Sequence, residues 1–172
     1  MTSEFSRLVD ARQLPAAPLR LEADAAERAA LAQRFGLESI ARLEAEVTLE
    51  PDGQAVIAHG SVEANIVQMC AVSGVPFPAR VAEPVSLRFI PGPVTELPEV
   101  EIEIDADACD EIPFEGTKFD LGEAIAQSLA LAIDPYATGP SADQVRKEAG
   151  LADEAASGPF AALAALKGKG AA

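Results

Sequence analysis

The sequence predicts an α+β fold: a mainly antiparallel β-sheet or partly open barrel, two main helices and a mobile C-terminal tail. Several segments alternate apolar and polar residues with a period of two, which is typical of half-buried strands. Two other segments carry helix-capping residues followed by apolar residues at helical spacing. The length of 172 residues suits one domain with additional tails.

The expected organisation is a single α+β domain over residues 1–136, a flexible linker over 137–158 and a C-terminal docking segment or tail over 159–172. The linker is predicted because residues 137–158 are mostly small and polar, with Gly-Pro steps near both ends.

The first expected elements are a short strand over residues 4–9 and a helix over 24–35. Asp24 is a suitable N-cap, and Glu27, three positions later, is the partner that completes a capping box. Gly36 suits the left-handed position that follows the end of a helix.

Two long strands follow, joined by the turn Pro51-Asp52-Gly53 as an antiparallel hairpin. The second strand alternates over residues 56–66. The first is expected to bury one face, made of Ala41, Leu43, Ala45, Val47 and Leu49.

The second half continues the sheet and adds a helix. A strand over residues 77–89 is expected to be interrupted near Pro84, which implies a bulge or an edge position, and a strand with an acidic outer face follows over 100–105. A second capping box at Asp120 and Glu123 begins a helix that should end before Pro135.

The C-terminal segment has an apolar stripe, because Phe160, Leu163 and Leu166 fall at helical spacing. A helix this short is marginal in water by itself. We expect it either to dock in a groove of a partner or to fold back over the protein's own apolar surface.

The formal net charge of −15 is concentrated in residues 96–123, where 11 acids face one base, Lys118. Proteins bind nucleic acid largely through Lys and Arg, so this segment disfavours a general RNA-coating role. A basic protein partner fits better, although surface acids can also serve solubility alone.

Catalytic motifs are missing from the sequence. The one histidine, His59, is expected on the surface of a strand, and no phosphate-binding loop or nucleophile elbow is present. Cys70 and Cys109 lack the close cysteine neighbours of a zinc site and are expected to be reduced thiols. We therefore expect no enzyme, no metal and no cofactor. The start lacks a signal pattern and no apolar run is long enough to span a membrane, so a cytoplasmic location is expected.

Three segments, in this order, resemble the YceD family of large ribosomal RNA subunit accumulation proteins, a bacterial group with a domain of unknown function. They are residues 60–77 around Cys70, the run from Asp120-Leu121-Gly122-Glu123 to Asp134-Pro135-Tyr136, and the terminal Pro159-Phe160-Ala161-Ala162-Leu163-Ala164-Ala165-Leu166-Lys167. Many members carry Cys-x-x-Cys in the first segment, whereas this chain has Ser73 at the second position. No metal ligand is therefore carried over.

The resemblance implies a non-enzymatic role in the synthesis, processing or accumulation of large-subunit ribosomal RNA. The charge adds the expectation of an acidic adaptor that binds a ribosomal protein or assembly factor and contacts RNA only indirectly. The main alternative is a module that binds a cationic small ligand or peptide; an enzyme with paired carboxylates and a purely structural protein also stay open. The candidate partner-binding residues are Asp120, Glu123, Pro159, Phe160, Leu163, Leu166 and Lys167.

Overall fold

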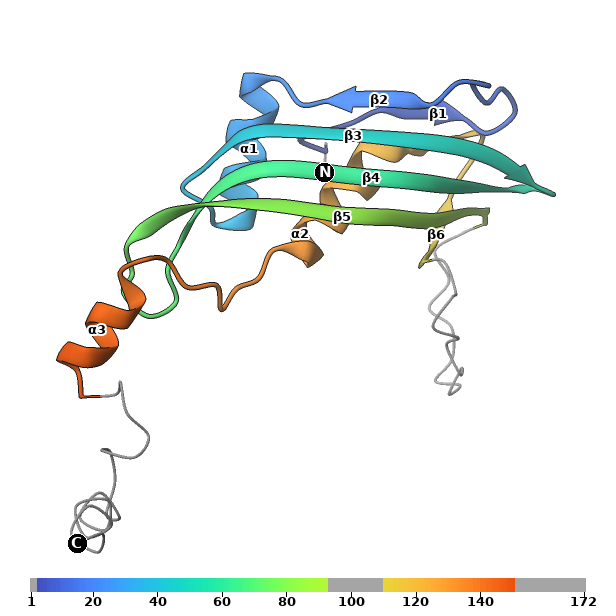
Figure 1. Ribbon diagram of the computed structural model, residues 1–172. Coiled ribbons are helices and arrows are strands. Elements are labelled where there is room, and N and C mark those ends of the chain that lie inside the picture. The colour runs from blue at the N-terminus through green and yellow to red at the C-terminus, as the bar shows by residue number, and fades with distance from the viewer. Residues whose placement is uncertain (1–2, 93–109, 151–172) are drawn as a thin grey trace, which may run out of the picture. The chain divides into compact units, whose positions relative to one another are not determined.

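The computed structural model describes residues 3–92 and 110–150 (Figure 1). These residues belong to two compact units. The sheet unit comprises the described residues of 3–67 and 79–133, and the loop unit comprises residues 68–78 together with those from 134 onward.

The sheet unit is built on five strands in the order β2-β3-β4-β5-β6. Because this order ends at β2 and β6, the described strands form an open sheet rather than a barrel. β2 with β3 and β3 with β4 pair antiparallel, as predicted for the hairpin, whereas β5 and β6 pair in parallel. The strands are β2 (Leu19–Glu22), β3 (Ser39–Asp52), β4 (Ala55–Met69), β5 (Pro76–Pro91) and β6 (Asp110–Phe114).

A second, two-stranded sheet joins the start of the chain to the segment before the last long helix. β1 (Leu8–Asp10) pairs antiparallel with β7 (Lys118–Asp120). The first strand therefore begins later than the expected 4–9, and Phe5 lies before it as a buried core residue, 1% exposed.

Both predicted long helices are confirmed. α1 (Ala25–Phe35) begins with the capping box of Asp24 and Glu27 and ends at Gly36 in the left-handed conformation, at φ 67°. α2 (Leu121–Ala132) ends before Pro135, as expected. Capping and turn chemistry thus defined these helices locally.

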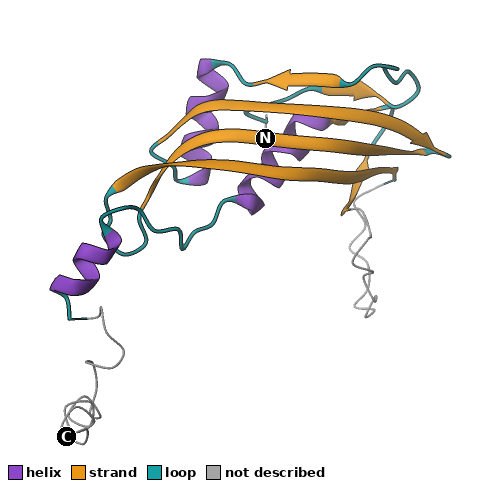
Figure 2. Cartoon of the chain, in the orientation of Figure 1, coloured by secondary structure: helices purple, strands orange, loops and turns teal. Residues whose placement is uncertain are grey.

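α1 and α2 cover the same face of the five-stranded sheet, and the core lies between them and the strands (Figure 2). Phenylalanine contributes more to this core than the low aromatic content suggests. The rings of Phe89 and Phe119 stack with centroids 4.1 Å apart, and Phe114 packs against Phe119 at 5.7 Å.

One predicted face needs a correction at the start of β3. Leu43, Ala45, Val47 and Leu49 are buried as expected, but Ala41 is exposed and Ile40 is buried in its place. The pairing with β4 shifts between Ile40 and Arg42. A bulge there moves the alternation by one residue, because an extra residue on one strand reverses the faces before it.

The strand predicted over residues 77–89 is β5, which is continuous, so the predicted interruption near Pro84 is wrong. Pro84 lies before Leu87, where pairing with β6 begins, which agrees with the expected edge position. The strand expected over residues 100–105 lies outside the described residues.

In the loop unit, the turn around Cys70 contacts the segment after α2. The amide of Ala71 donates to the carbonyl of Ala137, and the hydroxyls of Ser73 and Ser141 lie 2.8 Å apart. α3 (Ala142–Glu148) follows, within the segment predicted as a linker. The predicted domain boundaries themselves stay a prediction. Among the described helices, none is long and apolar enough to cross a membrane.

Candidate functional site

The helices α1 and α2 lie on one side of the five-stranded sheet (Figure 2). The opposite side, here called the open face, carries mostly polar residues. Alternation along the strands directs its residues away from the core. Across β3 and β4, Thr48 is paired with His59 and Glu46 with Ser61. The charged residues of the open face are Arg20, Glu22, Arg42, Glu44, Glu46, Glu50, Asp52, Glu63, Arg80, Arg88 and Glu111.

Each arginine of the open face lies beside a carboxylate. Arg42 donates to Glu44 at 2.6 Å and Arg80 donates to Glu63 at 2.8 Å. Arg20 is more loosely placed, 4.0 Å from Glu46. The hydrogen bond between Arg42 and Glu44 holds the pKa of Glu44 below its usual value and raises the pKa of Arg42. These guanidinium groups are therefore already occupied by carboxylates.

Arg88, on β5, links the end of β3 to the edge strand β6. Its guanidinium donates to Asp52 at 2.9 Å and to Glu111 at 2.7 Å. Both hydrogen bonds raise the pKa of Arg88, with Asp52 the larger cause. The side chain thus carries two acidic partners for one positive charge.

The open face consequently has an excess of negative charge. The residues named above include seven acids and four arginines, and Glu44 and Glu63 lie directly opposite each other across the β3–β4 pair. Like charges at such positions repel, and the neighbouring arginines offset that repulsion. Binding of a cationic group from another molecule would also offset this repulsion and is therefore favoured.

Two shallow pockets open on this surface. The first has a volume of about 280 Å³ and the second about 220 Å³, and both are lined by Arg42 and Glu63. The larger is also lined by Glu44, Glu46 and Ser61. Their walls combine both charge signs, which suits a charged side chain better than an apolar ligand.

His59 lies on the open face, as predicted. It is exposed, and its Nδ1 lies 3.4 Å from the hydroxyl of Ser86. Neither His59 nor Ser86 is among the residues that line the two pockets described above.

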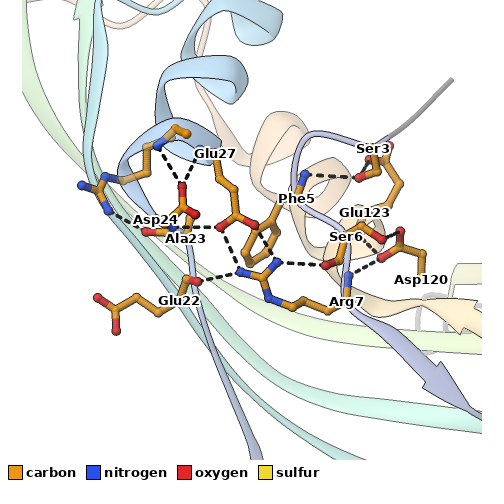
Figure 3. A network of polar contacts seen from close by, with 12 residues as sticks. Ser3, Phe5, Ser6, Arg7, Glu22, Ala23, Asp24, Glu27, Asp120 and Glu123 are labelled. Carbon is orange, nitrogen blue, oxygen red and sulfur yellow. Dashed lines mark hydrogen bonds and ion pairs between the residues drawn. The ribbon is translucent and has the colours of Figure 1, made fainter.

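Asp120 is placed at the junction of β7 and α2, where it orders the N-terminal segment (Figure 3). Its carboxylate accepts from the amide of Glu123 at 3.1 Å as the helix N-cap. It also accepts from the amide of Arg7 at 2.8 Å and from the hydroxyl of Ser6 at 2.6 Å. One carboxylate therefore caps α2 and fixes the chain before β1.

Glu123 does not complete the predicted capping box; its carboxylate instead connects α2 to α1. It accepts from Arg34 at 2.7 and 3.0 Å and from the hydroxyl of Ser3 at 2.7 Å. The hydrogen bonds from Arg34 are the main cause that lowers the pKa of Glu123 to about 2. The carboxylate of Glu123 thus binds Arg34 of α1 rather than the amide of the N-cap residue, because a charge-assisted hydrogen bond is stronger than a neutral one.

A second ion pair connects the N-terminal segment before β1 to α1. Arg7 donates to both carboxylate oxygens of Glu27, at 2.6 and 2.9 Å, while Glu27 also closes the capping box on Asp24 (Figure 3). The guanidinium of Arg7 lies 4.5 Å from the centroid of the Phe5 ring. This geometry gives Asp120, Glu123 and Glu27 intramolecular partners, and binding of a partner by Asp120 and Glu123 stays a prediction.

The other predicted partner-binding residues lie outside the described residues. They are Pro159, Phe160, Leu163, Leu166 and Lys167.

Cys70 lies in the loop unit and is buried, 2% exposed. Its sulfur accepts from the amide of Ser73 at 3.4 Å. Hydrogen bonds from the side chain and backbone of Ser73 lower the pKa of the thiol from 9.0 to about 6, so the thiol is more acidic than a free cysteine. Within residues 3–92 and 110–150, no group of three His, Cys, Asp or Glu side chains could hold a metal ion.

Sequence reasoning did not identify the arginine–carboxylate pairs of the open face. The alternating Arg and Glu residues along β3 were visible, but the partners of Arg80 and Arg88 are 17 and 23 or more positions away in sequence. Such pairs depend on strand order and register, which charge alternation alone does not determine.

Comparison with known proteins gives one result for the family. The family model described as large ribosomal RNA subunit accumulation protein YceD matches residues 58–167, more than half of the chain. The match begins in β4 and includes the Cys70 turn, Asp120, Glu123 and the C-terminal apolar stripe. No curated protein and no solved structure matches. The chain therefore belongs to the YceD family of large ribosomal RNA subunit accumulation proteins.

Proposed function

We propose that this protein supports accumulation of large-subunit ribosomal RNA as an acidic, non-enzymatic adaptor in the cytoplasm, and that it binds a basic ribosomal protein or assembly factor. The family supplies the connection with large-subunit ribosomal RNA. The observation that carries the adaptor mechanism is the open face, where each arginine is engaged by a carboxylate and acids exceed bases.

This charge arrangement favours protein over RNA as the direct contact. Binding of a nucleic acid depends on Lys and Arg that can replace counterions along the phosphates. On the open face, Arg42, Arg80 and Arg88 would first have to leave their carboxylates. A lysine- or arginine-rich partner needs no such exchange, because Glu22 and Glu50 have no ion pair among the described residues.

A cationic small ligand or peptide is the second candidate. The 280 Å³ pocket supports it, because Glu44, Glu46 and Glu63 line one small hollow. Native mass spectrometry of the purified protein distinguishes the two: a co-purified small ligand supports the second candidate, whereas a bound basic protein supports the adaptor.

The adaptor proposal is tested by affinity capture from cell lysate at low salt with a variant carrying Glu22→Gln, Glu46→Gln and Glu50→Gln. The wild type should retain a basic large-subunit protein or assembly factor, and the variant should retain several-fold less, since partner charge is no longer complemented. Raising the salt should release the wild-type complex, because exposed charges are screened.

A matched control removes the same charge elsewhere, with Glu38→Gln, Glu83→Gln and Glu148→Gln. These residues are exposed and do not belong to the open face. Equal loss of capture in both triple variants would assign the effect to net charge alone. Capture of no ribosomal protein, assembly factor or precursor RNA by the wild type would contradict the adaptor function.

A further inference from the structure

The loop unit presents an unusual concentration of exposed apolar side chains, here called the loop patch. It consists of Met69, Val72, Val75 and Tyr136, which are 48%, 36%, 50% and 81% exposed. Single apolar residues on a surface are ordinary, but several within one small unit indicate a surface that something covers.

Contacts inside the loop unit hold these residues near one another. The amide of Ala71 donates to the carbonyl of Ala137, which brings the neighbours Val72 and Tyr136 onto adjacent stretches of chain. Gly139 packs so closely on the ring of Phe77 that a Cβ atom there would lie 2.8 Å from the ring. The patch is therefore a defined surface on an ordered turn.

We propose that the protein's own C-terminal segment, residues 159–167, covers the loop patch. The apolar residues of this segment, Phe160, Leu163 and Leu166, are spaced three positions apart, so that a helix would carry them on one face. A helix of this length needs a surface to stabilise it, and the loop patch needs apolar cover. One contact satisfies both requirements.

The length of the chain permits this contact. α3 begins beside the loop, since Ser141 lies 2.8 Å from Ser73, and its seven residues span about 10 Å. Gly150 then turns the chain in the left-handed conformation, at φ 72°. The residues between Gly150 and Phe160 can extend over roughly 30 Å, so the apolar segment can return to Val72 and Val75.

Tethering also favours the protein's own segment over a second copy of the chain. A covalently attached segment reaches an effective concentration in the millimolar range. Two copies would each bring a net charge of −15, which opposes their association.

The test uses Tyr136, which is the only tyrosine in a chain without tryptophan, so tyrosine fluorescence reports on the loop patch alone. Acrylamide quenching is compared between the full chain and a variant with Phe160→Ser, Leu163→Ser and Leu166→Ser. The quenching constant should rise by about twofold in the variant, because the ring of Tyr136 loses its apolar cover and becomes accessible to acrylamide.

A matched control carries Ala161→Ser, Ala162→Ser and Ala164→Ser, which change the same segment outside its apolar stripe. Its quenching should equal that of the wild type. Substitution of the surface by Val75→Ser should raise quenching as the tail variant does, and combining the two should add little, because both remove the same contact.

Two results would overturn the proposal. Equal quenching in the full chain and the tail variant would leave the loop patch uncovered by this segment and available to another protein. Protection that disappears on roughly tenfold dilution would assign the cover to a second copy, because only an association between molecules depends on concentration. Neither result bears on the adaptor mechanism, which rests on the open face, or on the ribosomal connection, which rests on the family match.

Discussion

Glu123 illustrates how a single residue determines the packing of two helices. Its carboxylate accepts hydrogen bonds from Arg34 of α1 while it lies in the first turn of α2. The side chains of Glu123 and Arg34 are 24% and 34% exposed, so water screens the pair only partly.

The Glu123 pair predicts a dependence of stability on pH. Since the folded-state pKa is lowered from 4.5 to about 2, the stabilisation is present above about pH 4.5 and is lost as the pH falls toward 2. Glu123→Gln should lower the free energy of unfolding by about 1–2 kcal/mol near neutral pH and by little near pH 2. Urea unfolding over this pH range measures the difference.

Asp10 provides the control for this measurement. Arg12 lowers the pKa of Asp10 to about 2 as well, but the two residues are neighbours in sequence. Their contact can persist in the unfolded chain, so Asp10→Asn should leave the pH dependence almost unchanged. A similar loss in both variants would contradict the role given to the contact between α1 and α2.

Asp120 can be compared with Asp24 because both are aspartate N-caps. Among the described residues, the carboxylate of Asp24 accepts from amides of its own helix, whereas Asp120 also accepts from the amide of Arg7 and the hydroxyl of Ser6. Asp24→Ala should cost about 1 kcal/mol, and Asp120→Ala about 2–3 kcal/mol, because it also leaves the Arg7 amide without its acceptor. Thermal unfolding that ranks them in the opposite order would refute this difference.

Among the elements, the β3–β4 pair depends on one glycine. Gly60 lies opposite Val47 in the β3–β4 pair and is exposed. A Cβ atom at Gly60 would overlap the carbonyl oxygen of Glu46. This close approach explains a glycine in the middle of a long strand.

Gly60→Ala should therefore destabilise the protein by about 2–4 kcal/mol, because backbone rather than a flexible side chain must move. Ser61→Ala, one position along on the open face, should change the free energy of unfolding by less than about 0.5 kcal/mol. Denaturant titration of both variants checks this, and equal stabilities would show that β3 yields to the added methyl group.

The extent to which each element was predictable follows from how local its determinants are. The boundaries of α1 were predictable because Asp24, Glu27 and Gly36 lie next to the helix they define. The reversal of faces at Ala41 was not, since a bulge depends on the register with β4. The role of Glu123 was hidden for a similar reason: Arg34 is 89 positions away in sequence.

For the whole molecule, the combination of one covered and one open sheet face gives the protein two different surfaces. α1, α2 and the N-terminal segment complete the core on one side, while the open face carries paired arginines and additional carboxylates on the other. The net charge of −15 adds a long-range attraction for basic proteins. Family membership connects the protein by name with accumulation of large-subunit ribosomal RNA.

The most direct test of the adaptor function is the ratio of large- to small-subunit ribosomal RNA after depletion of this protein in its own cells. We predict that the ratio falls, that wild type and the control with Glu38→Gln, Glu83→Gln and Glu148→Gln restore it, and that the variant with Glu22→Gln, Glu46→Gln and Glu50→Gln does not. An unchanged ratio after depletion, or full restoration by the open-face variant, would contradict the account.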